Sequence, residues 1–159
     1  MSNSPLTHNI ALREVTIDNL NDVVDLPLLA HQKDYLASNS YSIAQSKFDP
    51  HCQPRAIYCD EVVVGFLMYH TQDCGVPHQV GIHRFMVDHR QQGKGIGRRA
   101  LELTLHEIRQ IPQVQRITIC YVPENQSAQQ FYASFGFQET GIDEDGEMIA
   151  VIELAPQEK

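Results

Sequence analysis

The sequence predicts a mixed α/β domain, and three observations support this fold class. Short apolar runs typical of strands alternate along the chain with longer runs of helical periodicity. Two strand-like runs in the middle of the chain are separated only by a short polar turn, as in a hairpin. A glycine-rich turn then joins a further strand directly to an amphipathic helix. The expected order of strands and helices is β-α-α-β-β-β-α-β-α-β-β.

The chain is expected to begin with one strand and two helical pieces. Apolar residues alternate loosely with polar ones over residues 9–16, which indicates a strand. Helical spacing follows over residues 18–48. Asp18 is the expected N-cap of the first piece, and Pro27 divides the segment in two because proline interrupts helical hydrogen bonding.

Three strands are expected next. Residues 55–70 hold two strand-like runs joined at residues 59–61, the pattern of a hairpin. Residues 78–88 form a third strand whose apolar alternation changes phase near His83 and Arg84. One extra residue in a strand moves every later side chain to the opposite face, so the phase change predicts a β-bulge.

The C-terminal half is expected to start with an amphipathic helix. Its apolar stripe begins at Ile96 and ends before Pro112. Four elements then complete the chain: a strand over residues 115–122, a short helix over residues 125–136 closed by Gly136, and strands over residues 136–141 and 146–154.

Composition and charge limit the class of function. Twelve Lys and Arg stand against twenty Asp and Glu, a net charge of −8. Nucleic-acid-binding domains usually carry a basic face, so we expect no nucleic-acid partner, whereas an acidic surface suits a small cation. No apolar run approaches the roughly 18 residues of a membrane helix, and the N-terminus lacks the pattern of a signal peptide. We therefore expect a cytoplasmic protein without a membrane partner, a single domain over residues 1–159 with residues 1–8 as a flexible tail.

The metal-ligating residue types show no pattern of a metal site. The four cysteines have no C-x-x-C spacing, and the eight histidines form neither an H-x-x-x-H nor an H-E-x-x-H pair. We expect reduced structural thiols and no metal.

The stretch "HRQQGKGIGRRALE", residues 89–102, is the clearest indication of a ligand. A strand, a glycine-rich turn and a helix together form a phosphate site, because the first amides of a helix have no internal partners and its dipole favours an anion. Glycines let the backbone approach the phosphate closely. Lys94, Arg98 and Arg99 add positive charge nearby.

Two nucleotide-binding motifs do not fit this stretch. A Walker A loop needs Ser or Thr after Gly-Lys, but Gly95 follows Lys94. In a dinucleotide fingerprint the third glycine would come one residue later than Gly97. A solvated glycine-rich turn without a ligand remains the structural alternative.

A third pattern fits completely. "QGKGIG", residues 92–97, matches the Q/R-x-x-G-x-G/A acyl-CoA signature, and "NQSAQQFYASFGF" matches a second motif, so the chain resembles the GNAT superfamily of N-acetyltransferases over nearly its whole length. The resemblance implies a mixed, mostly antiparallel central sheet of about seven strands flanked by helices. Within that superfamily, "DYLASNSYSIAQSKF", "IHRFMVDHRQQGKGIG" and "GEMIAVIEL" look most like bacterial spermidine/spermine (diamine) N-acetyltransferases.

The resemblance implies transfer of the acetyl group of acetyl-CoA to a primary amine. It assigns Tyr132 as the acid that protonates the departing thiolate; a tyrosine packed in the core is the alternative. In polyamine acetyltransferases of this superfamily a carboxylate commonly accepts the ammonium proton, but the matching position here is His83. A histidine is a chemically sensible substitute because it is largely neutral near pH 7; a structural histidine is the alternative.

The resemblance also assigns the cofactor site. Pantetheine is expected to pair with the backbone of the strand after the bulge, where the amide of Phe85 points at the thioester carbonyl, and pyrophosphate is expected on the loop amides. The complete expected set is Phe85, Met86, Val87, Gln92, Gly93, Lys94, Gly95, Ile96, Gly97, Arg98 and Asn125.

The acceptor amine is expected to meet acidic and hydroxyl groups. The candidates are Asp34, Tyr35, Asn39, Tyr41 and Glu147. The acidic run at residues 143–147 is also typical of a solvated turn. Other amines remain possible acceptors (an aminoglycoside, a small metabolite or a protein N-terminus), as does a non-catalytic acyl-CoA sensor. The resemblance and an exposed C-terminal strand favour a homodimer.

Overall fold

The computed structural model describes residues 9–27, 38–91 and 93–155. In these residues seven strands form one sheet, in the order β1-β2-β3-β4-β5-β7-β6. Every neighbouring pair is antiparallel except β4 and β5. The strands are β1 (Ile10–Glu14), β2 (Cys52–Cys59), β3 (Val62–His70), β4 (Gln79–Val87), β5 (Arg116–Tyr121), β6 (Gln138–Ile142) and β7 (Met148–Glu153). The expected mixed, mostly antiparallel sheet is confirmed.

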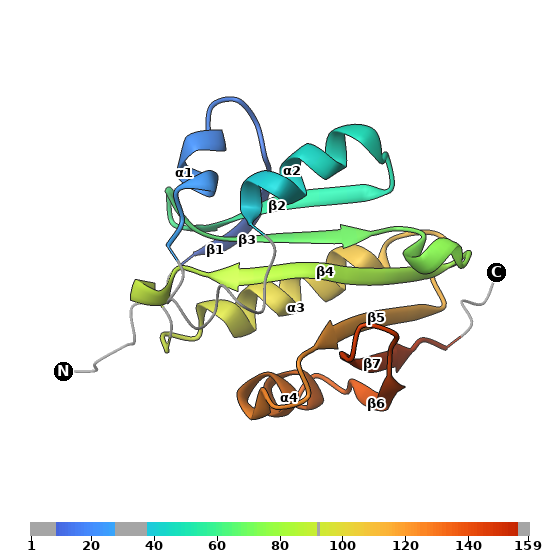
Figure 1. Cartoon of the computed structure of the whole chain (residues 1–159). Helices are drawn as coiled ribbons and strands as arrows, with labels where there is room; N and C mark the ends of the chain where they lie inside the picture. The colour runs from blue at the N-terminus through green and yellow to red at the C-terminus, as the bar shows by residue number, and fades with distance from the viewer. Residues whose placement is uncertain (1–8, 28–37, 92, 156–159) are drawn as a thin grey trace.

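In the part of the chain that the structure describes, four α-helices flank the sheet (Figure 1). They are α1 (Leu20–Val24), α2 (Asn39–Phe48), α3 (Ile96–Arg109) and α4 (Gln126–Ala133). The two sheet faces are covered by different helices. Val23 of α1 is buried with Phe66 and Met86 of the sheet, whereas Leu101 and Ile108 of α3 are buried on the other side. Burying each such side chain contributes roughly 1.5–3 kcal/mol to folding.

The start of α1 differs by one residue from the expectation. Asn19, not Asp18, is the N-cap. The Asn19 side chain is buried, accepts a hydrogen bond from the Thr16 amide at 2.8 Å and donates one to the Glu14 carbonyl at 3.0 Å. An amide side chain can donate and accept at once, so Asn19 pairs with both a backbone amide and a backbone carbonyl where β1 ends. The carboxylate of Asp18 could only accept.

The expected β-bulge lies in β4. Met68 of β3 pairs with Arg84 and Tyr69 pairs with Ile82, which leaves His83 as the extra residue. The Arg84 side chain binds Ser42 of α2, and His83 stacks on His70. The prediction from the change of apolar phase is therefore confirmed.

Within the described residues, the sheet opens between β4 and β5. Parallel pairing begins at Gln79 and Arg116 and ends at Ile82 and Ile119, after which the strands diverge (Figure 1). The bulge at His83 lies directly after this last pair. Among the described helices, none combines the length and apolar character that crossing a membrane requires.

Candidate active site

The β4 segment expected to bind the cofactor lies beyond the point where β4 and β5 stop pairing. Beyond the bulge, β4 continues along β3, with Phe85 opposite Leu67 and Val87 opposite Gly65. Met86 is buried against the α1 side of the sheet, and Phe85 points to the other side, with its ring 6.3 Å from Phe131 of α4. The backbone of this segment therefore runs between the two helical layers.

The glycine-rich loop has the backbone conformation that only glycine adopts easily. Gly93 and Gly95 have φ angles of +84° and +78°, in the left-handed region, and Gly95 is the N-cap of α3. An added Cβ at either residue would meet no other atom within 4 Å. The space above the loop is therefore open, and no side chain on either glycine covers the first amides of α3. A turn of this kind suits a phosphate anion.

Gly95→Ala should raise KM for acetyl-CoA by about tenfold or more, because the methyl group projects from the anion-binding turn and the left-handed residue costs roughly 1 kcal/mol. Steady-state kinetics with acetyl-CoA as the varied substrate measures this. Gly146→Ala is the matched control: its φ is +83° and its Cβ also meets no atom within 4 Å, but it lies in the turn before β7. A KM unchanged in the Gly95 variant would contradict the assignment.

The cations of the loop have different surroundings. Arg98 donates to Ser134 Oγ at 2.7 Å and lies 4.6 Å from the centre of the Phe135 ring, so it ties α3 to the end of α4. Lys94 is exposed and donates to Gln91 Oε1 at 3.1 Å. Ile96 is buried beneath the loop. Gln92, the first residue of the signature, lies outside the described residues.

Asn125 begins α4 as its N-cap. Its Oδ1 accepts a hydrogen bond from the Ala128 amide at 3.1 Å. This side chain fixes where α4 starts, after the end of β5, and so contributes to the placement of Tyr132, about two helical turns further on.

Tyr132 lies in an aromatic cluster between α4 and β5. Its ring stacks on Tyr121 with centres 5.7 Å apart, and the rings of Phe131 and Phe137 lie edge-on at 5.3 and 5.9 Å. Burial raises the pKa of Tyr132 well above its ordinary value, so the phenol keeps its proton at physiological pH. The two interpretations of Tyr132 made from the sequence, a residue packed in the core and a proton donor, are both compatible with this position.

His83 has a partner that the sequence did not indicate. Its Nε2 lies 2.8 Å from Oδ1 of Asp73, a buried residue in the 3₁₀ turn η2 (Asp73–Gly75) between β3 and β4. The other oxygen, Oδ2, accepts hydrogen bonds from Thr118 at 2.6 Å and Gln79 at 3.3 Å. Burial disfavours the Asp73 carboxylate, but the hydrogen bonds from His83, Thr118 and Gln79 outweigh it and lower the pKa to about 2.

Asp73 should make the protein lose stability in acid. Its pKa is about 2 in the folded chain and 3.8 as a free group, so the ionised form stabilises the fold above about pH 4, by at most about 2 kcal/mol, and this contribution disappears as the pH falls from about 4 to 2. Urea unfolding of the wild type and Asp73→Asn measures it. The free energy of unfolding of the variant should fall less steeply over that range; parallel curves would disprove the assignment.

Arg84 is the second site residue that the sequence analysis did not propose. Its guanidinium donates from Nε to Ser42 Oγ at 3.0 Å and from Nη1 to the His83 carbonyl at 2.7 Å. Burial lowers its pKa, while the negative charge of Glu147 acts in the opposite direction. Arg84 therefore lies near Glu147, one of the expected acceptor residues.

The other expected acceptor residues divide into two groups. The amide of Asn39 donates to the Val23 carbonyl at 3.0 Å and so joins α2 to α1. Tyr41 is 62% exposed on the same helix and is accessible to a ligand. Asp34 and Tyr35 lie outside the described residues.

Two carboxylates lie close to Cys120 where β5 leaves β4, with an oxygen of Asp143 and one of Glu147 within 4.8 Å of its Sγ. Desolvation of the thiol, together with the negative charges of Asp143, Glu147 and Asp73, raises the pKa of Cys120 to about 12. The pKa of Glu147 is itself raised, first by burial and then by Asp143 and Asp145, and Arg84 opposes this. Carboxylates crowded in this way favour a cationic ligand.

Two clusters in the described chain have the residue types of a metal site, but we assign neither to a metal. In the first, formed by Asp49, Cys52 and His70, His70 Nε2 is already paired with Asp49 at 2.8 Å. The second contains Cys120, whose raised pKa opposes the thiolate that a metal would bind.

Known proteins resemble this chain in sequence and in fold. A family model described as the acetyltransferase (GNAT) family matches residues 20–137. The spermine/spermidine N(1)-acetyltransferase of Bacillus subtilis (strain 168) is 30% identical over 151 residues, which cover 92% of this chain and 99% of that protein. The probable spermine N(1)-acetyltransferase of Bacillus subtilis subsp. natto (strain BEST195) is 29% identical with the same coverage.

Solved structures share the fold. The crystal structure of PaiA N-acetyltransferase from Thermoplasma acidophilum, in complex with coenzyme A, has a TM-score of 0.71. The match covers 92% of this chain and 99% of that one at 15% identity. At that identity the likeness concerns the fold alone.

Proposed function

The chain belongs to the acetyltransferase (GNAT) family, and on that premise we propose that this acetyl-CoA-dependent N-acetyltransferase acts on the primary amine of a polyamine such as spermidine or spermine. The observation that carries the choice of acceptor is the pair of carboxylates Asp143 and Glu147, whose oxygens lie within 4.8 Å of Cys120 Sγ. A polyamine carries several ammonium groups, so more than one carboxylate is needed to hold it. The names of the two Bacillus relatives support the same acceptor.

The residues divide the chemistry between them. Acetyl-CoA supplies an acyl carbon at which a C–N bond to the amine forms as the C–S bond breaks. His83 accepts the proton of the acceptor ammonium, either directly or through a water molecule, because a protonated amine has no lone pair for the attack. Tyr132 donates its proton to the thiolate sulfur. Burial keeps this proton on the phenol at physiological pH, so it is available when the thiolate forms.

The binding assignments follow the geometry. The amides from Gly93 to Arg98 hold the pyrophosphate, and the β4 edge from Phe85 to Val87 pairs with the pantetheine arm beyond the point where β5 departs. The amide of Phe85 polarises the thioester carbonyl. Tyr41 and Glu147 contact the acceptor, with Asn39 fixing the helix that carries Tyr41.

We also propose a cytoplasmic homodimer without a nucleic-acid partner. The net charge of −8 supports the last point. β6 is an edge strand of the sheet and Ile142 at its end is 55% exposed, which supports pairing of the C-terminal region with a second copy. Light scattering coupled to size exclusion measures the mass, and a monomer would refute the dimer.

A panel of acceptor amines tests the proposed function. Release of CoA thiol is followed with spermidine, spermine, an aminoglycoside, an amino-acid amide and a peptide N-terminus. We expect kcat/KM to be highest for the polyamines and to fall with ionic strength, because the acceptor site is acidic. A higher kcat/KM for another amine would replace the acceptor, and no stimulation by any amine would favour the acyl-CoA sensor.

A further inference from the structure

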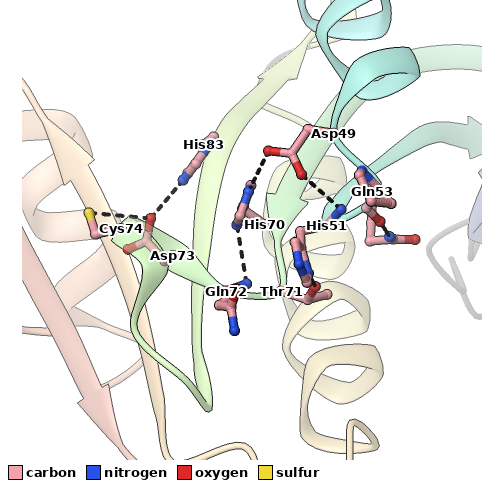
Figure 2. Close-up of polar contacts among 10 residues, drawn as sticks. Asp49, His51, Gln53, His70, Thr71, Gln72, Asp73, Cys74 and His83 are labelled. Atoms are coloured by element: carbon pink, nitrogen blue, oxygen red, sulfur yellow. Dashed lines mark hydrogen bonds and ion pairs between the residues drawn. The ribbon is translucent and has the colours of Figure 1, made fainter.

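We propose that Asp73 is a positioning residue for the base: it holds the proton of His83 on Nε2 and leaves Nδ1 as the atom that accepts the proton of the amine. That His83 is the base rests on the proposed function, but the position of the proton on its imidazole can be tested separately. The two side chains come from the η2 turn and the β4 bulge and point toward one another (Figure 2).

Each oxygen of Asp73 has its own donor. Oδ1 meets His83 Nε2 at 2.8 Å, and Oδ2 accepts from Thr118 at 2.6 Å and Gln79 at 3.3 Å. The carboxylate therefore links its own turn, η2, to both β4 and β5. It cannot rotate away from His83 without leaving hydrogen-bonding groups unpaired in a buried place.

Gly81 provides the space for this carboxylate. A Cβ added at Gly81 would lie 2.5 Å from Asp73 Cγ and 2.7 and 2.8 Å from its two oxygens, closer than any real contact. Strand β4 thus has no side chain at the position where Asp73 lies over it. A glycine in the middle of a strand weakens it, so its presence here has a local reason in the fit of the carboxylate.

The hydrogen bonds determine the tautomer. Thr118 and Gln79 donate to Asp73, and an ionised carboxylate only accepts, so Nε2 of His83 must be the donor. In a neutral imidazole the lone pair is then on Nδ1. When Nδ1 takes a proton, the positive ring lies beside a negative carboxylate that stabilises it.

The other groups around His83 are few. The ring of His70 on β3 stacks on it with centres 5.5 Å apart, and His70 Nε2 is paired with Asp49 at 2.8 Å (Figure 2). The guanidinium of Arg84 donates to the His83 carbonyl at 2.7 Å. Among these contacts, the one that reaches a ring nitrogen of His83 comes from Asp73.

Nitrogen NMR of the imidazole groups tests the assignment without any acetyl transfer. The resonances of His83 are identified by their loss in His83→Gln. We expect the wild type near pH 8 to show one tautomer, protonated at Nε2, with a slowly exchanging proton. Asp73→Asn should give a mixture, because an amide can either donate or accept. The matched control Asp49→Asn alters the neighbouring pair and should leave the His83 tautomer unchanged. Protonation at Nδ1 in the wild type would overturn the proposal.

The pH profile separates positioning from a structural role. In Asp73→Asn the imidazolium loses its counter-charge, so the acidic limb of kcat/KM for the amine should move about one pH unit lower. The plateau should fall at least tenfold while KM for acetyl-CoA stays the same. An unshifted limb with a uniformly lower rate would overturn the proposal. If no amine is acetylated, the proposed function fails while the tautomer result still decides the role of Asp73.

Two further variants apply if Asp73→Asn does not fold. Gly81→Ala keeps the carboxylate but displaces it, and should change the His83 tautomer and shift the acidic limb as Asp73→Asn would. Thr118→Val removes one donor to Oδ2 and keeps the bond to His83, so its effect should be smaller. A Gly81→Ala protein with the wild-type tautomer and acidic limb would contradict the proposal.

Discussion

Tyr132→Phe should lower kcat for acetyl transfer by about 10²–10⁴-fold while the affinity for CoA stays within about twofold. Phenylalanine keeps the ring that stacks on Tyr121 and meets Phe131 and Phe137 edge-on, so the cluster and the adjacent loop remain in place. What is lost is the proton that burial keeps on the phenol. Steady-state kinetics with the best acceptor gives kcat, and calorimetry with CoA gives the affinity.

Tyr121→Phe is the matched control for this experiment. It removes the hydroxyl of the neighbouring ring, which donates to Glu139 at 2.7 Å on the far side of the cluster. We expect a lower melting temperature and a kcat within about threefold of the wild type, since a lost hydrogen bond changes stability by about 1 kcal/mol. Equal losses of kcat in the two variants would mean that Tyr132 acts through packing and not as an acid.

His83→Gln should lower kcat/KM for the amine by about 10²-fold at pH 7 and remove the acidic limb of the enzyme's pH profile. Glutamine is close in size and can still donate to Asp73, so the buried carboxylate keeps a partner. The remaining pH dependence should be that of the acceptor alone, whose ammonium group loses its proton near pH 10. A pH–rate series between pH 5.5 and 10 measures both effects.

The stacked neighbour supplies the comparison for His83. His70→Gln removes the other imidazole of the pair, whose partner is Asp49. The acidic limb of the pH–rate profile should persist in His70→Gln, with a modest change in kcat/KM for the amine. If the acidic limb of the pH–rate profile survives in His83→Gln and vanishes in His70→Gln, His70 is the base. If the acidic limb survives in both variants, neither histidine is the base.

The sequence contained the parts of the site that depend on local backbone geometry. The change in apolar phase predicted the bulge because strand alternation has a period of two, and the register confirms it at His83. The glycine pattern predicted the turn before α3 because Gly93 and Gly95 need left-handed φ angles. Both features arise from neighbouring residues, so they can be recognised without knowing the fold.

The partner of His83 depends on contacts between distant parts of the chain, which the sequence did not indicate. Asp73 is ten residues before His83, and the two meet because β3 and β4 form an antiparallel pair with the η2 turn folded back between them. Thr118 completes the site from β5, 45 residues away from Asp73. Arg84 escaped notice for a similar reason: an arginine in a strand is usually exposed, and only the bulge turns this one toward α2.

The space that Gly81 leaves for Asp73 has a consequence for evolution within the family. An acid at position 73 and any side chain at position 81 compete for the same volume, so neither position can change alone without loss. Relatives that use an aspartate–histidine pair in this place should therefore carry the spacing D-x₇-G-x-H, whereas relatives with a carboxylate at position 83 are released from the restriction and should tolerate alanine or larger residues at position 81. The residue types at positions 73, 81 and 83 should therefore covary across aligned homologues, so this short sequence pattern would mark the type of base.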